Sequence, residues 1–388
     1  MDIWSIYPEY KNTRFADRYI DPTEWVAYCQ ELPSEFKVAN EGCSEEGRTI
    51  LHLKWGTGKC HLLLWSQMHG NEPTATLAIS DLFNLLSNGS TDARTKDLVN
   101  GWMNEFTFHF IPILNPDGAI RYQRRNANGI DINRDAVKQA TAESRFFWDL
   151  MKEIKPELGF NLHDQRTMYS AGHTDNPATI SFLAPSPDAE RSVNAARVKS
   201  ISLGGYLTQV LRPHLGDCIA RYSDEFYPTS FGDNLQKQDI PVLLIESGES
   251  ATTPNREETR RANFFCLAAG FTALQNDQLS ENHSASYFAL PENQARFFDL
   301  ILTSVSWKGG VTDVGLRCQE TLVDGRLRRV FEVADIGDLR FSPRFAEFDA
   351  DGFSWEGSVE LEKEPQATFE KDGRAVVLDR YAEAFIGK

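Results

Sequence analysis

Two residue types that bind zinc stand close together at His69 and Glu72, in the tetrapeptide HGNE. None of the other seven histidines has a glutamate three residues after it. A catalytic zinc site takes three ligands from His and carboxylate side chains and leaves one position for water. His163 is the third candidate ligand, and it lies far along the chain. Spacing alone leaves an alternative open, because a turn histidine followed by an acid in the first turn of a helix gives the same pattern.

Apolar stretches that are typical of buried strands end on polar residues at four places. They are KCHLLLWSQ before Met68 and HGNE, FTFHFIPIL (106–114) before the NPDG turn (115–118), ELGFNLH ending on His163, and IPVLLIE ending on Glu246. In open α/β sheets, ligands bind outside the carboxyl ends of the strands. We therefore expect these polar side chains to share one pocket.

A third segment, RYQRRNANGIDINRD (121–135), is rich in groups that bind carboxylates. The planar guanidinium of arginine matches a carboxylate with two parallel hydrogen bonds. The alternative interpretation is a solvated basic turn. We expect IDIN (130–133) to be a strand or extended segment that holds Arg134 in place.

Helical and strand patterns alternate over the first 278 residues. We expect helices at 22–31, 74–88, 142–154, 191–215 and 256–275, and a strand at 49–55 joined by Gly-Thr-Gly to the strand before HGNE. His109 lies inside an apolar strand and is interpreted as a core residue. His52, His61, His173, His214 and His283 lack an evident partner set and are interpreted as structural. The alternation predicts an α/β fold with a mixed, largely parallel sheet sandwiched by helices.

The character of the sequence changes near residue 280. We expect a catalytic domain at 1–278, a polar linker at 279–292 and a small β-rich domain of unknown role at 293–388. Its expected strands are 299–307, 310–318, 327–336, 353–362 and 374–380.

Composition excludes some partners. The formal net charge is −16 and the pI about 5.0, which argues against nucleic acid or an anionic membrane as a main partner. Six cysteines form no CxxC pair, and we expect scattered buried thiols. The sequence shows neither a signal peptide nor a stretch of membrane-spanning length, so we expect a soluble cytoplasmic protein.

HGNE, NPDG, RRNANGIDINR, His163 and Glu246, in this order, resemble the zinc metallocarboxypeptidase family, which includes carboxypeptidase A. The resemblance extends from Trp65 to about Gly248. It implies one Zn²⁺ per chain, bound by His69, Glu72 and His163.

The resemblance also implies roles for the surrounding residues. Asp131 would orient His69, and Asn133 with Arg134 would hold the terminal carboxylate of the substrate. Arg124 would stabilise the oxyanion, with the adjacent Arg125 as the alternative. Glu246 would act as general base and then as general acid. The lid tyrosine of the family has no certain counterpart; Tyr227 is the first candidate and Tyr222 the second. A second departure is Asp164-Gln165-Arg166, which follows His163 where pancreatic-type enzymes have a serine-rich turn.

The predicted function is hydrolysis of a C-terminal peptide or amide bond in a substrate with a free carboxylate. The alternative is an N-acyl-amino-acid deacylase resembling succinylglutamate desuccinylase or aspartoacylase, which share the zinc ligands. NPDG and the NANG spacing favour the peptidase. A zinc-binding or peptide-binding module without turnover is a third possibility, and the oligomeric state stays open.

Overall fold

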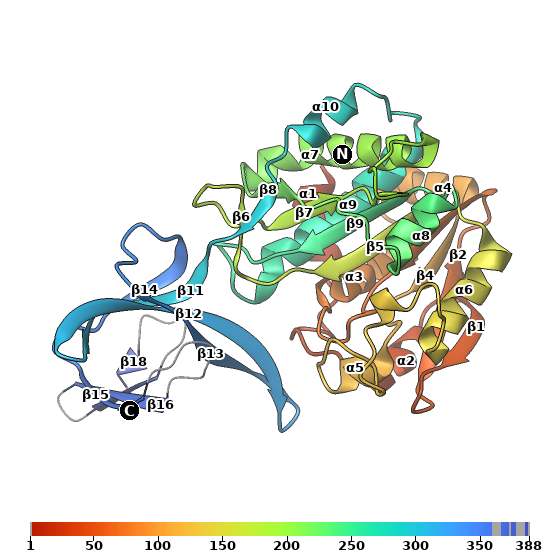
Figure 1. Ribbon diagram of the computed structural model, residues 1–388. Coiled ribbons are helices and arrows are strands. Elements are labelled where there is room, and N and C mark those ends of the chain that lie inside the picture. The colour runs from red at the N-terminus through yellow and green to blue at the C-terminus, as the bar shows by residue number, and fades with distance from the viewer. Residues whose placement is uncertain (1, 359–365, 372–373, 378–384, 387–388) are drawn as a thin grey trace.

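The computed structural model describes residues 2–358, 366–371, 374–377 and 385–386 (Figure 1). Its centre is an eight-stranded mixed sheet with strand order β1-β2-β4-β3-β5-β9-β7-β8. The four strands β4, β3, β5 and β9 are parallel, and antiparallel pairs join β1 to β2, β2 to β4 and β7 to β9. The strands are β1 Lys37–Cys43, β2 Thr49–Trp55, β3 Cys60–Trp65, β4 Phe106–Ile111, β5 Leu158–Asp164, β7 Ile180–Leu183, β8 Ile219–Arg221 and β9 Val242–Ser247.

Successive residues of β3 point into two different cores. Leu62 and Leu64 belong to the larger core, while Leu63 and Trp65 belong to the smaller one on the opposite face. This alternation follows from the two-residue period of a strand, and it makes a central strand apolar throughout. The larger core includes residues of α1 Ile3–Tyr10, α2 Pro22–Gln30, α3 Thr74–Asn88, α4 Lys96–Glu105, α7 Ala195–Leu215 and α9 Glu257–Gln275, and the smaller core includes residues of α6 Ala142–Ile154 and α8 Phe231–Lys237. The predicted helix-covered α/β sheet is therefore confirmed.

The strands expected before and after Gly-Thr-Gly are present as β2 and β3, and β4 lies between them in the sheet. Two local expectations need correction. Residues 132–134 form a 3-10 turn (η1, Ile132–Arg134), not an extended segment, because the Asp131 carboxylate accepts the N–H of Asn133 and caps the turn. NPDG is more than a turn, since α5 (Pro116–Ile120) begins there.

The C-terminal part contains two four-stranded sheets of order β13-β12-β11-β14 and β15-β16-β17-β18. Figure 1 places them together to one side of the helix-covered sheet. The expected strands 353–362 and 374–380 continue past Ser358 and Val377 into residues outside the described ranges. The strands are β11 Phe298–Trp307, β12 Gly310–Val323, β13 Arg326–Gly337, β14 Arg344–Asp349, β15 Ser354–Ser358, β16 Gln366–Lys371, β17 Arg374–Val377 and β18 Phe385–Ile386.

The segment 279–292, expected as a linker, contains the short helix α10 (His283–Phe288), which lies along α7. Directly after it, β10 (Asn293–Ala295) pairs with β6 (Tyr169–Ala171) of the preceding part of the chain. The six cysteines form no disulfide in the part of the chain that the structure describes; Cys29 and Cys266 are buried, and Cys43 is exposed. In the part of the chain that the structure describes, the helices are too short or too polar to cross a membrane.

Candidate metal centre and active site

The three predicted metal ligands lie together and are buried. His69 and Glu72 follow β3, and His163 is near the end of β5, the neighbouring parallel strand. Nδ1 of His69 lies 2.8 Å from Oε1 of Glu72, and Nδ1 of His163 lies 2.8 Å from Oε2 of the same carboxylate. Burial opposes ionisation of Glu72, but the two imidazoles outweigh it and lower the pKa of Glu72 below its ordinary value.

This donor set fits zinc. One ligand atom from each of the three residues lies within 4.8 Å of the other two. A tetrahedral ion with ligand distances of about 2.0–2.1 Å needs donors roughly 3.3 Å apart, so small side-chain shifts would accommodate it. Two imidazoles with one carboxylate is also the ligand chemistry of catalytic zinc sites, which keep a fourth position open.

Backbone packing fixes the HGNE loop. A Cβ on Gly70 would lie 2.0 Å from the carbonyl carbon of Gly118, so only glycine allows this approach of HGNE to NPDG. The Asn115 side chain caps α5 by accepting the N–H of Gly118 at 2.8 Å. Its amide nitrogen donates to the carbonyl of Met68 at 3.2 Å, directly before His69. NPDG therefore holds the backbone next to His69, the first metal ligand, in place.

The structure separates Arg124 from Arg125. Arg124 lines the cleft and its Nη1 donates to Oε1 of Glu72 at 3.2 Å, with 44% of its side chain exposed. Its Nε donates to Oδ2 of Asp131 at 3.1 Å, while Oδ1 of Asp131 lies 3.1 Å from Nε2 of His69. Arg125 is exposed and donates to the carbonyl of Gly129 instead. Asp131 thus links His69 to Arg124, and Arg125 does not line the cleft.

Glu246 lines the same cleft from β9. It is the register partner of His163 on β5. Its Oε2 is buried and accepts no hydrogen bond from the described residues. Burial, and then the negative charges of Glu72 and Asp164, raise the pKa of Glu246 well above its ordinary value.

Both residues of the predicted carboxylate-binding pair line the cleft. Arg134 is exposed, and its guanidinium carbon lies 4.8 Å from the centre of the Tyr227 ring. The Asn133 side chain accepts the N–H of Phe231 at 3.0 Å. Tyr222, the second lid candidate, also lines the cleft, and burial followed by the charge of Glu246 raises its pKa. Both tyrosines therefore stay candidates.

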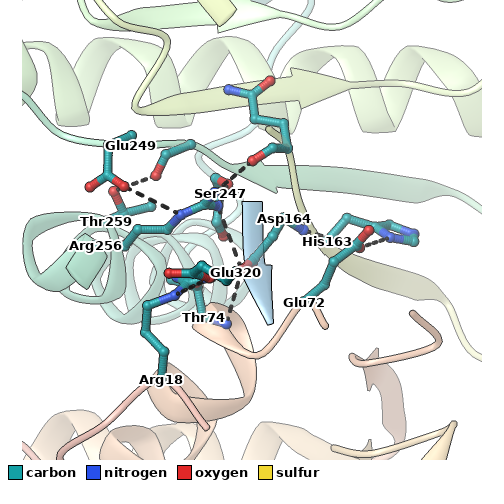
Figure 2. Close-up of polar contacts among 12 residues, drawn as sticks. Arg18, Glu72, Thr74, His163, Asp164, Ser247, Glu249, Arg256, Thr259 and Glu320 are labelled. Atoms are coloured by element: carbon teal, nitrogen blue, oxygen red, sulfur yellow. Dashed lines mark hydrogen bonds and ion pairs between the residues drawn. The ribbon is translucent and has the colours of Figure 1, made fainter. Parts of the chain in front are cut away.

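The cleft that holds these residues has a volume of about 910 Å³. It is also lined by polar side chains that the sequence analysis missed or gave no role: Arg18, Asn161, Asp164, Asp233, Glu249, Arg256 and Glu320. Figure 2 shows Asp164 between Thr74 and Arg256, with Arg18 and Glu320 close by. Of these residues, only Asp164 was noted in the sequence, because it departs from the family pattern directly after His163.

His52 and His61, interpreted as structural residues without an evident partner set, do have a shared partner in His109. Nε2 of His52 lies 2.9 Å from Nδ1 of His109, and Nε2 of His109 lies 2.8 Å from Nδ1 of His61. His109 is nonetheless buried, as expected of a core residue. These three side chains, called the histidine row below, lie across the adjacent strands β2, β4 and β3 and away from the cleft.

Known proteins are similar to this chain in sequence and in fold. Residues 23–156 match the family model described as zinc carboxypeptidase, Peptidase_M14. A probable carboxypeptidase 2 of Trichophyton verrucosum is 26% identical over 251 residues, which cover 61% of this chain and 41% of that protein. Carboxypeptidase E of Caenorhabditis elegans is 29% identical over 147 residues, 30% of this chain and 31% of that protein. The chain thus spans less than half the length of these curated relatives.

Solved structures share the fold. A metallo-carboxypeptidase from Burkholderia cenocepacia aligns with a TM-score of 0.51 at 20% identity, covering 66% of this chain and 68% of that one. A putative carboxypeptidase from Burkholderia mallei gives a TM-score of 0.51 at 19% identity, covering 66% and 67%. The sequence matches and the shared fold confirm the resemblance that the motifs indicated: residues 23–156 match the zinc carboxypeptidase family, and the helix-covered sheet has the fold of these metallo-carboxypeptidases.

Proposed function

We propose that the protein is a zinc-dependent carboxypeptidase that hydrolyses the C-terminal peptide bond of its substrate. The observation that carries the proposal is the meeting of His69, Glu72 and His163 with Glu246 and Arg134 in one cleft. An arginine that binds a terminal carboxylate favours an exopeptidase, because an internal peptide bond offers no carboxylate there.

The residues divide the reaction between them. When bound, zinc supplies a Lewis acid and lowers the pKa of a coordinated water. Asn133 and Arg134 hold the terminal carboxylate, and so place the scissile carbonyl. Glu246 accepts a proton from the attacking water and delivers it to the leaving amine. Arg124 faces the cleft and donates to the oxygen on which negative charge develops. Neutralisation of Glu72 by the ion would lessen the repulsion that raises the pKa of Glu246.

The Asn161 amide indicates which terminal side chain of the substrate the cleft accepts. It is fully buried in the cleft wall, and neither its Oδ1 nor its Nδ2 has a hydrogen-bond partner among the described residues. Its Nδ2 lies 3.8 Å from the place of a Cβ on Gly232, and the preceding residue, Phe231, is bound by Asn133. We therefore expect a terminal side chain that can form hydrogen bonds, such as glutamine, to be hydrolysed faster than methionine, which has a similar size.

The test combines metal content with a substrate panel. We expect about one zinc per chain, release of the last residue from peptides, and no release from the same peptides amidated at the C-terminus. Glu246→Gln should bind zinc as the wild type does, and its kcat should be lower by about 10²–10⁴-fold. Hydrolysis confined to N-acyl amino acids would replace this proposal with the deacylase. Zinc-free protein, or full activity in Glu246→Gln, would refute the mechanism.

A further inference from the structure

A carboxylate of the C-terminal β-rich part reaches the cleft. Glu320 of β12 accepts a hydrogen bond from the Tyr122 hydroxyl at 2.6 Å and from Nε of Arg18 at 3.1 Å, both through Oε2. The strand segment 317–320 lines the cleft together with the metal ligands. Figure 2 shows Glu320 beside Arg18.

Arg18 touches three segments that each adjoin a residue of the proposed site. Its Nη1 donates to the Thr74 hydroxyl at 2.9 Å, two residues after Glu72. Its Nη2 donates to Oδ2 of Asp164 at 3.4 Å, one residue after His163. The same nitrogen donates to the Tyr122 hydroxyl at 3.2 Å, two residues before Arg124. One guanidinium therefore joins the backbone segments of two metal ligands and of the proposed oxyanion donor.

Arg18 is buried, so its positive charge needs negatively charged partners. Its side chain is 5% exposed, and Asp164, its other carboxylate partner, is 4% exposed. A buried guanidinium needs compensating negative charge, and loss of one partner leaves an uncompensated charge. Burial opposes ionisation of Glu320, but Arg18 and then Arg256 outweigh it and lower the pKa of Glu320 to about 2. Glu320 is thus an anion at neutral pH and balances Arg18.

A second connection holds the same strand in place. Oδ2 of Asp299 on β11 accepts the Thr167 hydroxyl at 2.9 Å and the N–H of Cys318 at 2.8 Å. Thr167 lies in the loop that follows His163 and Asp164. The backbone N–H groups of Arg296 and Phe297 donate to the carbonyl of Met168 in that loop, both at 2.9 Å. The β-rich part therefore contacts the loop after the third metal ligand as well as Arg18.

We propose that Glu320 is a positioning residue of the metal site, and that the C-terminal β-rich domain is thereby a part of the catalytic unit. Glu320 fixes Arg18 and Tyr122, and through them the segments that carry Glu72, His163 and Arg124. Its effect on turnover rests on the proposed function, but its effect on metal binding does not.

The experiment measures zinc affinity by competition with a chelator, together with kcat and KM on a cleaved peptide. Residues around metal ligands change metal affinity by about 10–100-fold when mutated. We expect Glu320→Gln, which keeps the shape and removes the charge, to bind zinc about 10-fold more weakly and to lower kcat more than it raises KM. Glu347→Gln is the matched control, since it makes the same change on β14 against the partly exposed Arg344 and should leave all three values unchanged.

Each outcome decides the proposal. Wild-type zinc affinity and kcat in folded Glu320→Gln would overturn it. If Glu320→Gln fails to fold, Tyr122→Phe takes its place, because it removes only the hydroxyl that binds Glu320 and Arg18; threefold weaker zinc binding supports the proposal, and unchanged binding overturns it. If the wild-type protein binds zinc but cleaves no peptide, the proposed function fails, while the zinc affinities still decide the role of Glu320.

Discussion

Acidification should destabilise the fold through the histidine row of His52, His109 and His61. The Asn40 amide donates to Nδ1 of His52 at 3.3 Å, so Nε2–H of His52 can donate to His109, and Nε2–H of His109 can donate to His61. This order satisfies every ring nitrogen between Asn40 and His61 only while His52 and His109 are neutral. Burial lowers the pKa of His52 to about 4, and burial with the adjacent histidines lowers the pKa of His109 to about 3.

The sign and the size follow from proton linkage. In the unfolded chain both histidines have a pKa of about 6.5, so between pH 6.5 and 4 the unfolded state binds protons that the folded state does not. The free energy of unfolding is therefore at its full value above pH 6.5 and falls as the pH is lowered. At pH 5, each histidine costs roughly 2 kcal/mol, because each pH unit is worth about 1.36 kcal/mol. Together they cost about 4 kcal/mol, a large share of a typical stability of about 5–15 kcal/mol.

Urea unfolding at a series of pH values between 7 and 4.5 measures the effect. The wild-type protein and His109→Gln, whose amide can still donate and accept, are compared by the slope of the unfolding free energy against pH. Loss of one proton-binding site should reduce the slope of the variant by about 1.4 kcal/mol per pH unit. His173→Gln removes an exposed histidine and should leave the slope unchanged. Equal slopes in wild type and His109→Gln would refute the reasoning.

Three further changes test the site. Arg134→Met should raise KM about 10–100-fold for peptides with a free C-terminus, because hydrogen bonds to charged groups contribute about 1.5–3 kcal/mol; an unchanged KM, measured by steady-state kinetics, would remove Arg134 from carboxylate binding. Asp131→Ala should weaken zinc binding about 10–100-fold in chelator competition, since it frees Nε2 of His69; wild-type affinity would contradict this role. Gly70→Ala should lower the free energy of unfolding in urea by about 1–3 kcal/mol, because its Cβ would overlap Gly118, whereas Gly337→Ala, with no atom within 4 Å of the new Cβ, is the control.

Sequence patterns predicted the parts of the molecule that depend on local spacing. The helices that begin at Pro22, Thr74 and Ala142 follow from apolar periodicity and start signals, and the structure has them at those positions. The meeting of His69 with His163 followed from a general rule, since the ends of adjacent parallel strands lie at one edge of a sheet. The structure brings these residues together as expected.

The histidine row could not be predicted because it depends on strand order. His52, His109 and His61 belong to β2, β4 and β3, and the sequence does not show that β4 lies between the consecutive strands β2 and β3. The three side chains contact one another only because β4 lies between β2 and β3. The expectation of extended backbone at 130–133 was wrong for a different reason. The alternation of Ile130 and Ile132 is typical of a strand, but the Asp131 side chain caps a 3-10 turn at 132–134.

Arg18 and Glu320 were missed because they meet only in three dimensions. Arg18 lies between α1 and α2, and Glu320 lies on β12, about three hundred residues later along the chain. Neither belongs to a motif with a fixed spacing. A single buried arginine or glutamate gives no periodic signal, so contacts between separate parts of the chain escape pattern-based prediction.

Several carboxylates near the proposed metal ligands are buried, among them Glu72, Asp131 and Glu249. The carboxylates of Glu72, Asp164, Glu246, Glu249 and Glu320 line the cleft together with several guanidinium groups, among them Arg18, Arg124, Arg134 and Arg256. Burial of excess charge is costly, and a carboxyl group relieves it by staying protonated. Burial indeed raises the pKa of Glu246 and of Asp164, and for Glu246 the charge of Glu72 adds to the effect. A divalent ion between His69, Glu72 and His163 would offset the charge of Glu72, which would favour the ionised form of Glu246 that accepts a proton.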